Sequence, residues 1–149
     1  MPASLHFKEL LRKFNELQVR YLIVGAYAVM KYTEPRYTKD LDIWVDVTPD
    51  NASRVFRALA DFGAPMKSVT VDDFTNPELV FQIGIEPHRI DIMMHVKGLE
   101  FSQAWANRVE ATFEDVAILL VSKEDLLISK TAAGRPQDLI DAAQLKVDR

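Results

Sequence analysis

Cysteine is absent from this 149-residue chain, and its absence removes several classes of site at once. Disulfide scaffolds, thiolate zinc sites and cysteine nucleophiles all depend on this residue. Any metal must therefore be held by oxygen or imidazole ligands. Such a donor set favours hard cations such as Mg²⁺.

Long apolar runs and an excess of positive charge are also missing. No segment approaches the roughly 18 apolar residues that a membrane span needs, and the start of the chain lacks the features of a signal peptide. We therefore expect a cytoplasmic protein without membrane contact. The formal net charge of -4 argues against a broad DNA-binding surface, because such a surface needs clustered lysine and arginine.

Nothing in the sequence marks a boundary between domains. We find no internal repeat, no low-complexity tract and no linker rich in glycine or serine. A chain of 149 residues with 48% hydrophobic content is long enough to build one compact core. The sequence therefore predicts a single domain over residues 1–149.

The spacing of apolar residues predicts helices interleaved with strands. We expect helices over residues 5–17, 26–30, 48–62, 123–133 and 135–147, and strands over residues 21–24, 40–47, 79–83, 89–96, 108–113 and 116–121. This order is typical of an α/β or α+β fold. It predicts a small mixed β-sheet covered by helices, with a helical hairpin at the C-terminal end.

Two aspartates fall on one face of the strand expected over residues 40–47. Side chains at positions i and i+2 of a strand point the same way, about 7 Å apart, so the carboxylates of Asp40 and Asp42 can reach one cluster of cations. Trp44 follows on this face, most simply as a packing residue. The alternative interpretation of the acids is an exposed edge strand on which they are merely solvated.

A third aspartate, Asp91, lies in the apolar strand expected over residues 89–96. An ionised carboxylate is costly there unless a cation or hydrogen bonds stabilise it. Together with Asp40 and Asp42 it can hold two divalent ions about 3.5 to 4 Å apart, which is the arrangement used to activate a hydroxyl and neutralise a leaving phosphate. Arg89, two residues earlier, is equally suited to pairing with these acids or to contacting a substrate.

A glycine turn adds an independent feature. Gly25 joins the strand over residues 21–24 to the following helix, and a glycine there lets backbone amides and the helix N-terminus face an anion such as a triphosphate. The glycine is also explained by backbone geometry alone. Arg36 and Lys39 flank the acidic strand, where they either offset triphosphate charge or are solvated in the loop.

Several segments of the chain together resemble the minimal nucleotidyltransferases of the DNA polymerase beta-like superfamily. They are residues 22–29, residues 35–43 and residues 89–92. The spacing K-x4-R-x2-D-x2-D, from Lys130 through Arg135 and Asp138 to Asp141, is similar to the last motif of the abortive-infection toxin (AbiEii-like) branch. The resemblance extends from about residue 22 to residue 141 and implies the nucleotidyltransferase fold.

The resemblance also implies an activity and a set of metal ligands. Members of this superfamily transfer a nucleoside monophosphate from a nucleoside triphosphate to an acceptor, with Mg²⁺ as cofactor and pyrophosphate as leaving group. Here the acceptor would be a protein or an RNA. Asp40 and Asp42 would bind metal, and Asp91 would complete the metal site and take the proton from the acceptor hydroxyl.

The phosphate contacts that the resemblance implies come from both ends of the chain. Gly25 and Ala26 would hold the triphosphate, although the superfamily usually has Gly-Gly or Gly-Ser at this turn and Ala26 offers only its backbone amide. Lys130 would contact a phosphate. Asp138 would lie beside Lys130 in the helical hairpin and orient it.

Other functions remain open at this point. A non-catalytic nucleotide-binding module, or a regulatory module of a toxin and antitoxin pair, would keep the same fold without turnover. An acidic protein-interaction domain would bind neither nucleotide nor metal. A toxin and antitoxin partner and a homodimer are both compatible with so short a chain.

Overall fold

The structure, a computed structural model, describes residues 3–35, 40–85 and 88–147. Helices and strands alternate along most of the chain. In chain order the elements are α1 (Ala3–Glu16), β1 (Tyr21–Val24), α2 (Gly25–Tyr32), β2 (Asp40–Val45), α3 (Pro49–Phe62), the 3₁₀ helix η1 (Val71–Thr75), β3 (Val80–Ile83), β4 (Arg89–Met93), α4 (Phe101–Ala106), β5 (Val109–Phe113), β6 (Val116–Leu120), α5 (Lys123–Ala133) and α6 (Pro136–Leu145).

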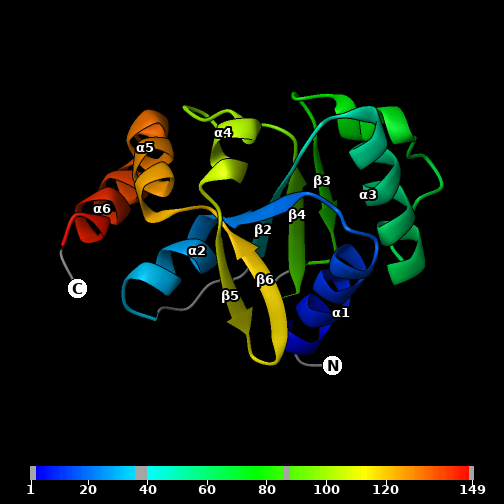
Figure 1. Cartoon of the computed structure of the whole chain (residues 1–149), viewed down its shortest axis with the longest axis horizontal. Helices are drawn as coiled ribbons and strands as arrows, with labels where there is room; N and C mark the ends of the chain where they lie inside the picture. Colours follow the sequence, from blue (N-terminus) through cyan, green and yellow to red (C-terminus); the bar gives the residue numbers. More distant parts are fainter. Residues whose placement is uncertain (1–2, 36–39, 86–87, 148–149) are drawn as a thin grey trace.

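The strands form one mixed sheet in the order β3-β4-β2-β1-β6-β5. Strands β2 and β4 run parallel, as do β1 and β6, while the other neighbouring pairs are antiparallel. Helices α1 and α3 lie together on one side of the molecule, and the α5–α6 hairpin lies on the opposite side (Figure 1). The mixed sheet, the covering helices and the C-terminal hairpin predicted from the sequence are thus confirmed.

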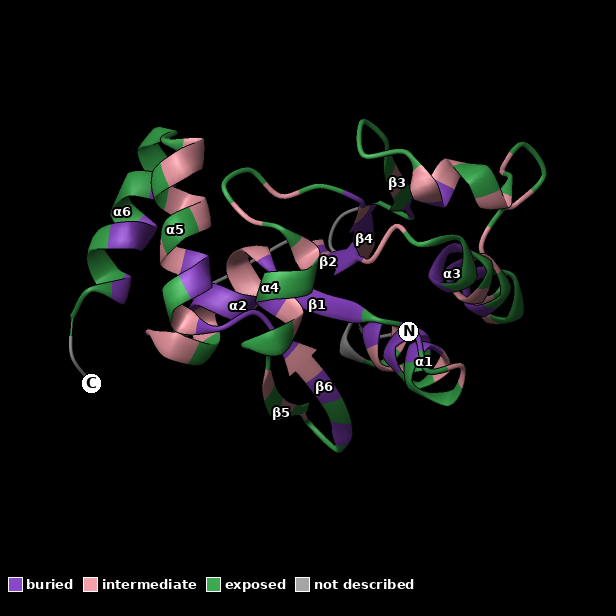
Figure 2. Cartoon of the chain, turned by 45° about the horizontal axis from the view of Figure 1, so that its top comes forward, coloured by how far each residue is buried: buried purple, intermediate pink, exposed green. Residues whose placement is uncertain are grey.

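A large part of the core lies between the sheet and the helices α1 and α3. Most apolar residues of α1 are buried, as are the residues of β2 and β4 that alternate with the aspartates (Figure 2). These side chains are Phe7, Leu10, Leu11, Phe14, Leu41, Ile43, Ile90 and Ile92. Burying each such side chain contributes about 1.5 to 3 kcal/mol, so this core fixes β2 and β4 side by side.

Strand β2 ends two residues earlier than expected, at Val45 instead of residue 47. The side chain of Asn51 accounts for this, because its amide donates to the carbonyls of Asp46 (2.8 Å) and Arg20 (3.1 Å). Asn51 Oδ1 also accepts from the Arg20 amide at 2.7 Å. The Asp46 amide still donates to the Arg20 carbonyl at 3.2 Å. The buried Asn51 side chain adds its bonds at this point, before the start of β1 and after the end of β2, where the chain turns into α3.

Two short elements, α4 and η1, were not predicted from the sequence. Helix α4 determines the environment of Trp44. Helix α4 places Phe101 against Trp44, with ring centroids 5.0 Å apart in an edge contact. Trp44 is therefore only 2% exposed. Trp44 is thus a packing residue, as the sequence indicated. The alternative of an exposed edge strand is wrong, because β2 lies inside the sheet between β4 and β1.

None of the helices in the described part of the chain combines the length and apolar character that crossing a membrane requires.

Candidate active site

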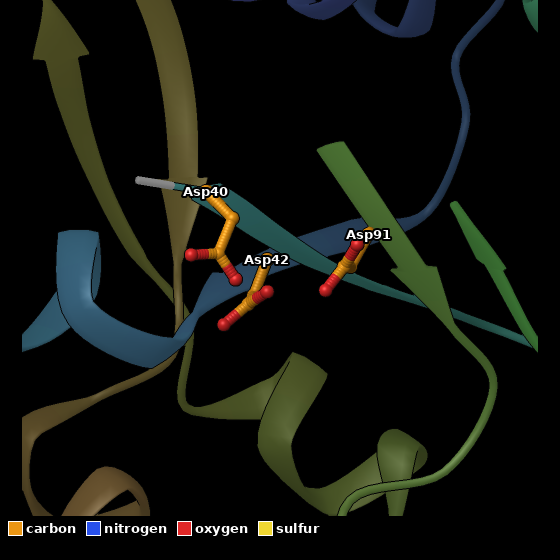
Figure 3. Close-up of side chains that lie close together, drawn as sticks. All are labelled: Asp40, Asp42 and Asp91. Atoms are coloured by element: carbon orange, nitrogen blue, oxygen red, sulfur yellow. The ribbon is translucent and has the colours of Figure 1, made fainter. Parts of the chain in front are cut away.

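Strand register brings the aspartates together. In the parallel pairing of β2 with β4, Asp42 lies directly beside Asp91, and Asp40 lies beside Arg89. The side chains of Asp40, Asp42 and Asp91 project from the same face of the sheet (Figure 3). One carboxylate oxygen from each lies within 4.8 Å of the others. Residues separated by about fifty positions in the chain therefore form one carboxylate cluster.

Arg89 neutralises part of this cluster. Its Nε donates to Asp91 Oδ1 at 3.0 Å, and its Nη2 donates to Asp91 Oδ2 at 2.9 Å and to Asp40 Oδ2 at 3.2 Å. Asp91 is only 6% exposed, so these charge-assisted bonds stabilise a carboxylate that burial would otherwise destabilise. The structural pairing considered for Arg89 from the sequence is present.

Asp42 remains the least compensated member of the cluster. Its pKa is raised from 3.8 to about 7: burial is the largest cause, the neighbouring carboxylates of Asp40 and Asp91 add to it, and Lys130 and Arg89 offset only part of the effect. Within the described part of the chain, the cations beside Asp42 thus do not balance the negative charge of the three carboxylates. A divalent cation would supply the missing positive charge.

The residues present fit a hard divalent ion. All three side chains offer carboxylate oxygens, the donors that Mg²⁺ prefers. Gly25 has φ of +70°, and a Cβ at this position would run into the carboxylate of Asp42. The first residue of α2 therefore leaves room for the Asp42 side chain at the mouth of the cluster, which a side chain at residue 25 would fill.

A cleft of about 260 Å³ opens beside Asp42 and leads to the C-terminal hairpin. Gly25 and Asp42 line one side, and Lys130, Arg135 and Asp138 of the hairpin line the other. The carboxylate of Asp42 thus lies across the cleft from the cations of Lys130 and Arg135. A larger cleft of about 790 Å³ lies elsewhere and contains none of the three clustered aspartates, so its size does not make it the better candidate.

Two buried aspartates hold Lys130 in position. Its Nζ lies 3.1 Å from Asp141 Oδ2 and 3.4 Å from Asp138 Oδ1, and these acids are 0% and 2% exposed. Asp138 also accepts from Arg135 Nε at 2.6 Å. Burial acts to raise the pKa of Asp138, but the Arg135 hydrogen bond and the charge of Lys130 outweigh it and lower that pKa.

The remaining residues singled out from the sequence lie in different places. Ala26 is half-buried in the first turn of α2, next to Gly25. Arg36 and Lys39 lie outside the described residues. Arg135 lines the cleft, although sequence reasoning placed it only within a motif; its position five residues after Lys130, at the start of the second helix, was the available signal.

The fold and the site together define the class of protein. The structure is similar to the crystal structure of the lincosamide antibiotic adenylyltransferase LnuA with lincomycin bound, with a TM-score of 0.59 and 18% sequence identity, covering 98% of this chain and 96% of that chain. It therefore has a nucleotidyltransferase-like fold. The chain belongs to the family described as "Nucleotidyltransferase of unknown function" (DUF6036), which matches residues 5–147. Comparison with curated proteins gives no match.

The raised pKa of Asp42 makes the stability of the metal-free protein depend on pH. Because its folded-state pKa of about 7 exceeds the ordinary value of 3.8, the folded state binds this proton more tightly than the unfolded state. The stabilisation that comes from binding this proton is therefore present at low pH and is lost as pH rises from about 4 to 7. Without metal, Asp42→Asn should be more stable than wild type at pH 8, by about 2 to 4 kcal/mol, and this gain should shrink at pH 5.

Urea unfolding in a chelator at both pH values measures this difference. Asp46→Asn, a change just beyond the end of β2, serves as the control and should show the same offset from wild type at both pH values. An Asp42→Asn protein less stable than wild type at pH 8 would contradict the excess of negative charge in the cluster.

Proposed function

We propose that the protein transfers a nucleoside monophosphate from a nucleoside triphosphate to a hydroxyl group of a protein or RNA acceptor, with Mg²⁺ as cofactor and release of pyrophosphate. One observation carries this proposal. Oxygens of Asp40, Asp42 and Asp91 lie within 4.8 Å of one another, and Asp42 lines a cleft whose other side carries Lys130 and Arg135. Such a site presents metal ligands and phosphate-binding cations to the same substrate.

The proposed chemistry is a single displacement at the α-phosphorus. The acceptor hydroxyl oxygen forms a bond to this phosphorus, the bond to the oxygen that bridges to the β-phosphorus breaks, and pyrophosphate leaves with that oxygen. Asp91 takes the hydroxyl proton. Divalent ions, when bound by Asp40, Asp42 and Asp91, supply the positive charge that activates the hydroxyl and stabilises the leaving group.

The triphosphate is assigned to the cleft between α2 and the α5–α6 hairpin. The turn at Gly25 and Ala26 offers backbone amides at the start of α2. Lys130 meets the phosphates from the opposite side, held in place by Asp138 and Asp141. The side chain of Arg135 is 77% exposed. It can therefore contact a phosphate while one edge of its guanidinium stays hydrogen-bonded to Asp138. Arg36 and Lys39 remain proposed phosphate contacts.

Two features bear on the acceptor and the biological setting. The K-x4-R-x2-D-x2-D spacing from Lys130 to Asp141 supports a role within a toxin and antitoxin pair, as enzyme or as a silent nucleotide-binding module. The structural neighbour LnuA is an adenylyltransferase for a lincosamide antibiotic, so small hydroxyl compounds are also tested as acceptors. A protein or RNA acceptor stays part of the proposal, and the experiment below compares it with small hydroxyl compounds.

The experiment begins with thermal unfolding in Mg²⁺ and each of the four nucleoside triphosphates. Wild type should gain stability with at least one of them, and Asp42→Asn should lose that gain because it lacks a metal ligand. Triphosphates labelled at the α-phosphate are then incubated with cell extract and with small hydroxyl compounds. Label transferred above the Asp42→Asn level supports the enzyme; binding without transfer leaves the silent module; no thermal shift with any triphosphate contradicts both.

A further inference from the structure

Arg89 occupies the position where a cation is expected. It lies at the start of β4, in register with Asp40 across the strand pair. Its guanidinium engages both oxygens of Asp91 and one oxygen of Asp40, at 2.9 to 3.2 Å. The side chain is 30% exposed, so it has a route towards solvent.

The oxygens that Arg89 binds belong to the same cluster that can hold a metal. Asp40, Asp42 and Asp91 carry three carboxylates, and a guanidinium supplies one positive charge where a divalent ion would supply two. Two cations drawn to the same oxygens repel each other. The guanidinium and a divalent ion therefore compete for Asp91 and Asp40.

We propose that Arg89 is a resident counter-cation, which takes the place of the divalent ion in the metal-free protein and is displaced when the ion binds. This inference rests on the proposed function, because it assumes that the cluster is a metal site. Under this proposal, Arg89 has opposite effects on the stability of the metal-free protein and on its affinity for a divalent ion. The side chain stabilises the metal-free fold and weakens the binding of a divalent ion in the absence of nucleotide.

The opposite signs of these effects provide the test. Mn²⁺ binding is measured by electron paramagnetic resonance, in which only the free ion gives the sharp signal, and thermal unfolding is followed with and without Mn²⁺. Arg89→Met keeps much of the side-chain stem and removes the charge. It should bind Mn²⁺ roughly tenfold more tightly than wild type, since a charge-assisted interaction no longer has to be broken. Its metal-free melting temperature should fall by about 5 °C, and saturating Mn²⁺ should close this gap.

Further variants separate charge from shape and guard against misfolding. Arg89→Lys keeps a cation and should bind Mn²⁺ close to the wild-type affinity. Arg89→Gln replaces the guanidinium with a neutral donor and should follow Arg89→Met, so it also serves if the methionine variant does not fold. Arg12→Met removes an arginine from an exposed ion pair with Asp115 and should leave Mn²⁺ binding unchanged.

The outcomes distinguish this inference from the proposed function. If Arg89→Met and Arg89→Gln bind Mn²⁺ no more tightly than wild type, while Asp42→Asn abolishes binding, the competition is overturned and the metal site stands. If wild type and every Arg89 variant fail to bind Mn²⁺, the proposed metal-dependent function fails together with the inference.

Discussion

Replacing Asp42 with asparagine is expected to lower the rate of nucleotidyl transfer by at least about a thousandfold, which corresponds to about 4 kcal/mol of lost transition-state stabilisation. Asp42 lies between Asp40 on its own strand and Asp91 on the neighbouring strand, and it also lines the cleft assigned to the triphosphate. An amide keeps the shape of the side chain but removes the charge that holds a cation. Pyrophosphate release in the presence of the acceptor, with saturating Mg²⁺ and triphosphate, measures the effect.

Asp46→Asn is the matched control for this experiment. Asp46 follows the same strand but lines the larger cleft, away from the carboxylate cluster, so its replacement should change the rate less than about threefold. If the two variants lose activity equally, or if Asp42→Asn retains more than about a tenth of the wild-type rate, the cluster is not the catalytic centre.

Replacing Lys130 with methionine is expected to cause the largest loss of stability among the changes considered. Asp138 and Asp141 are 2% and 0% exposed, and Lys130 Nζ lies within 3.4 Å of an oxygen of each. Removing the cation leaves buried negative charge poorly compensated, which typically costs about 3 to 5 kcal/mol. Urea unfolding at pH 7.5 measures the change, and the loss should be smaller at acidic pH, where a protonated carboxyl tolerates burial better.

Lys13→Met provides the comparison, because it removes a lysine from an exposed ion pair with Glu16 at 3.5 Å. Such a surface pair contributes between about 0 and 1 kcal/mol. Equal losses in Lys130→Met and Lys13→Met would mean that the buried aspartates do not depend on Lys130. The proposal that these acids hold Lys130 towards the cleft would then lose its support.

Much of the site could be predicted because its geometry follows from strand alternation. Asp40 and Asp42 share a face wherever β2 forms, and Asp91 is costly in an apolar strand without a partner. The hairpin that carries Lys130 was also predictable. Its first helix begins at a serine cap and ends at Gly134, and Pro136 opens the second helix.

The remaining features depend on contacts between distant segments. The parallel pairing of β2 with β4, which aligns Asp42 with Asp91, cannot be read from either strand alone. Helix α4 spans only six residues, too few for a periodic apolar stripe, and its aromatic residues pack on Trp44 and on each other. The contacts of Arg89 with two acids likewise follow from the register, because its spacing to Asp91 indicated a shared face but not the bridge to Asp40.

A crystal structure of the protein with Mn²⁺ would test the shared metal site most directly, through the anomalous signal of the ion. We expect a peak bound by carboxylate oxygens of Asp40, Asp42 and Asp91 at about 2.0 to 2.2 Å, with the guanidinium of Arg89 moved off Asp40 and Asp91. A peak at any other place, with Asp40 and Asp91 still bound by Arg89, would contradict the shared metal site.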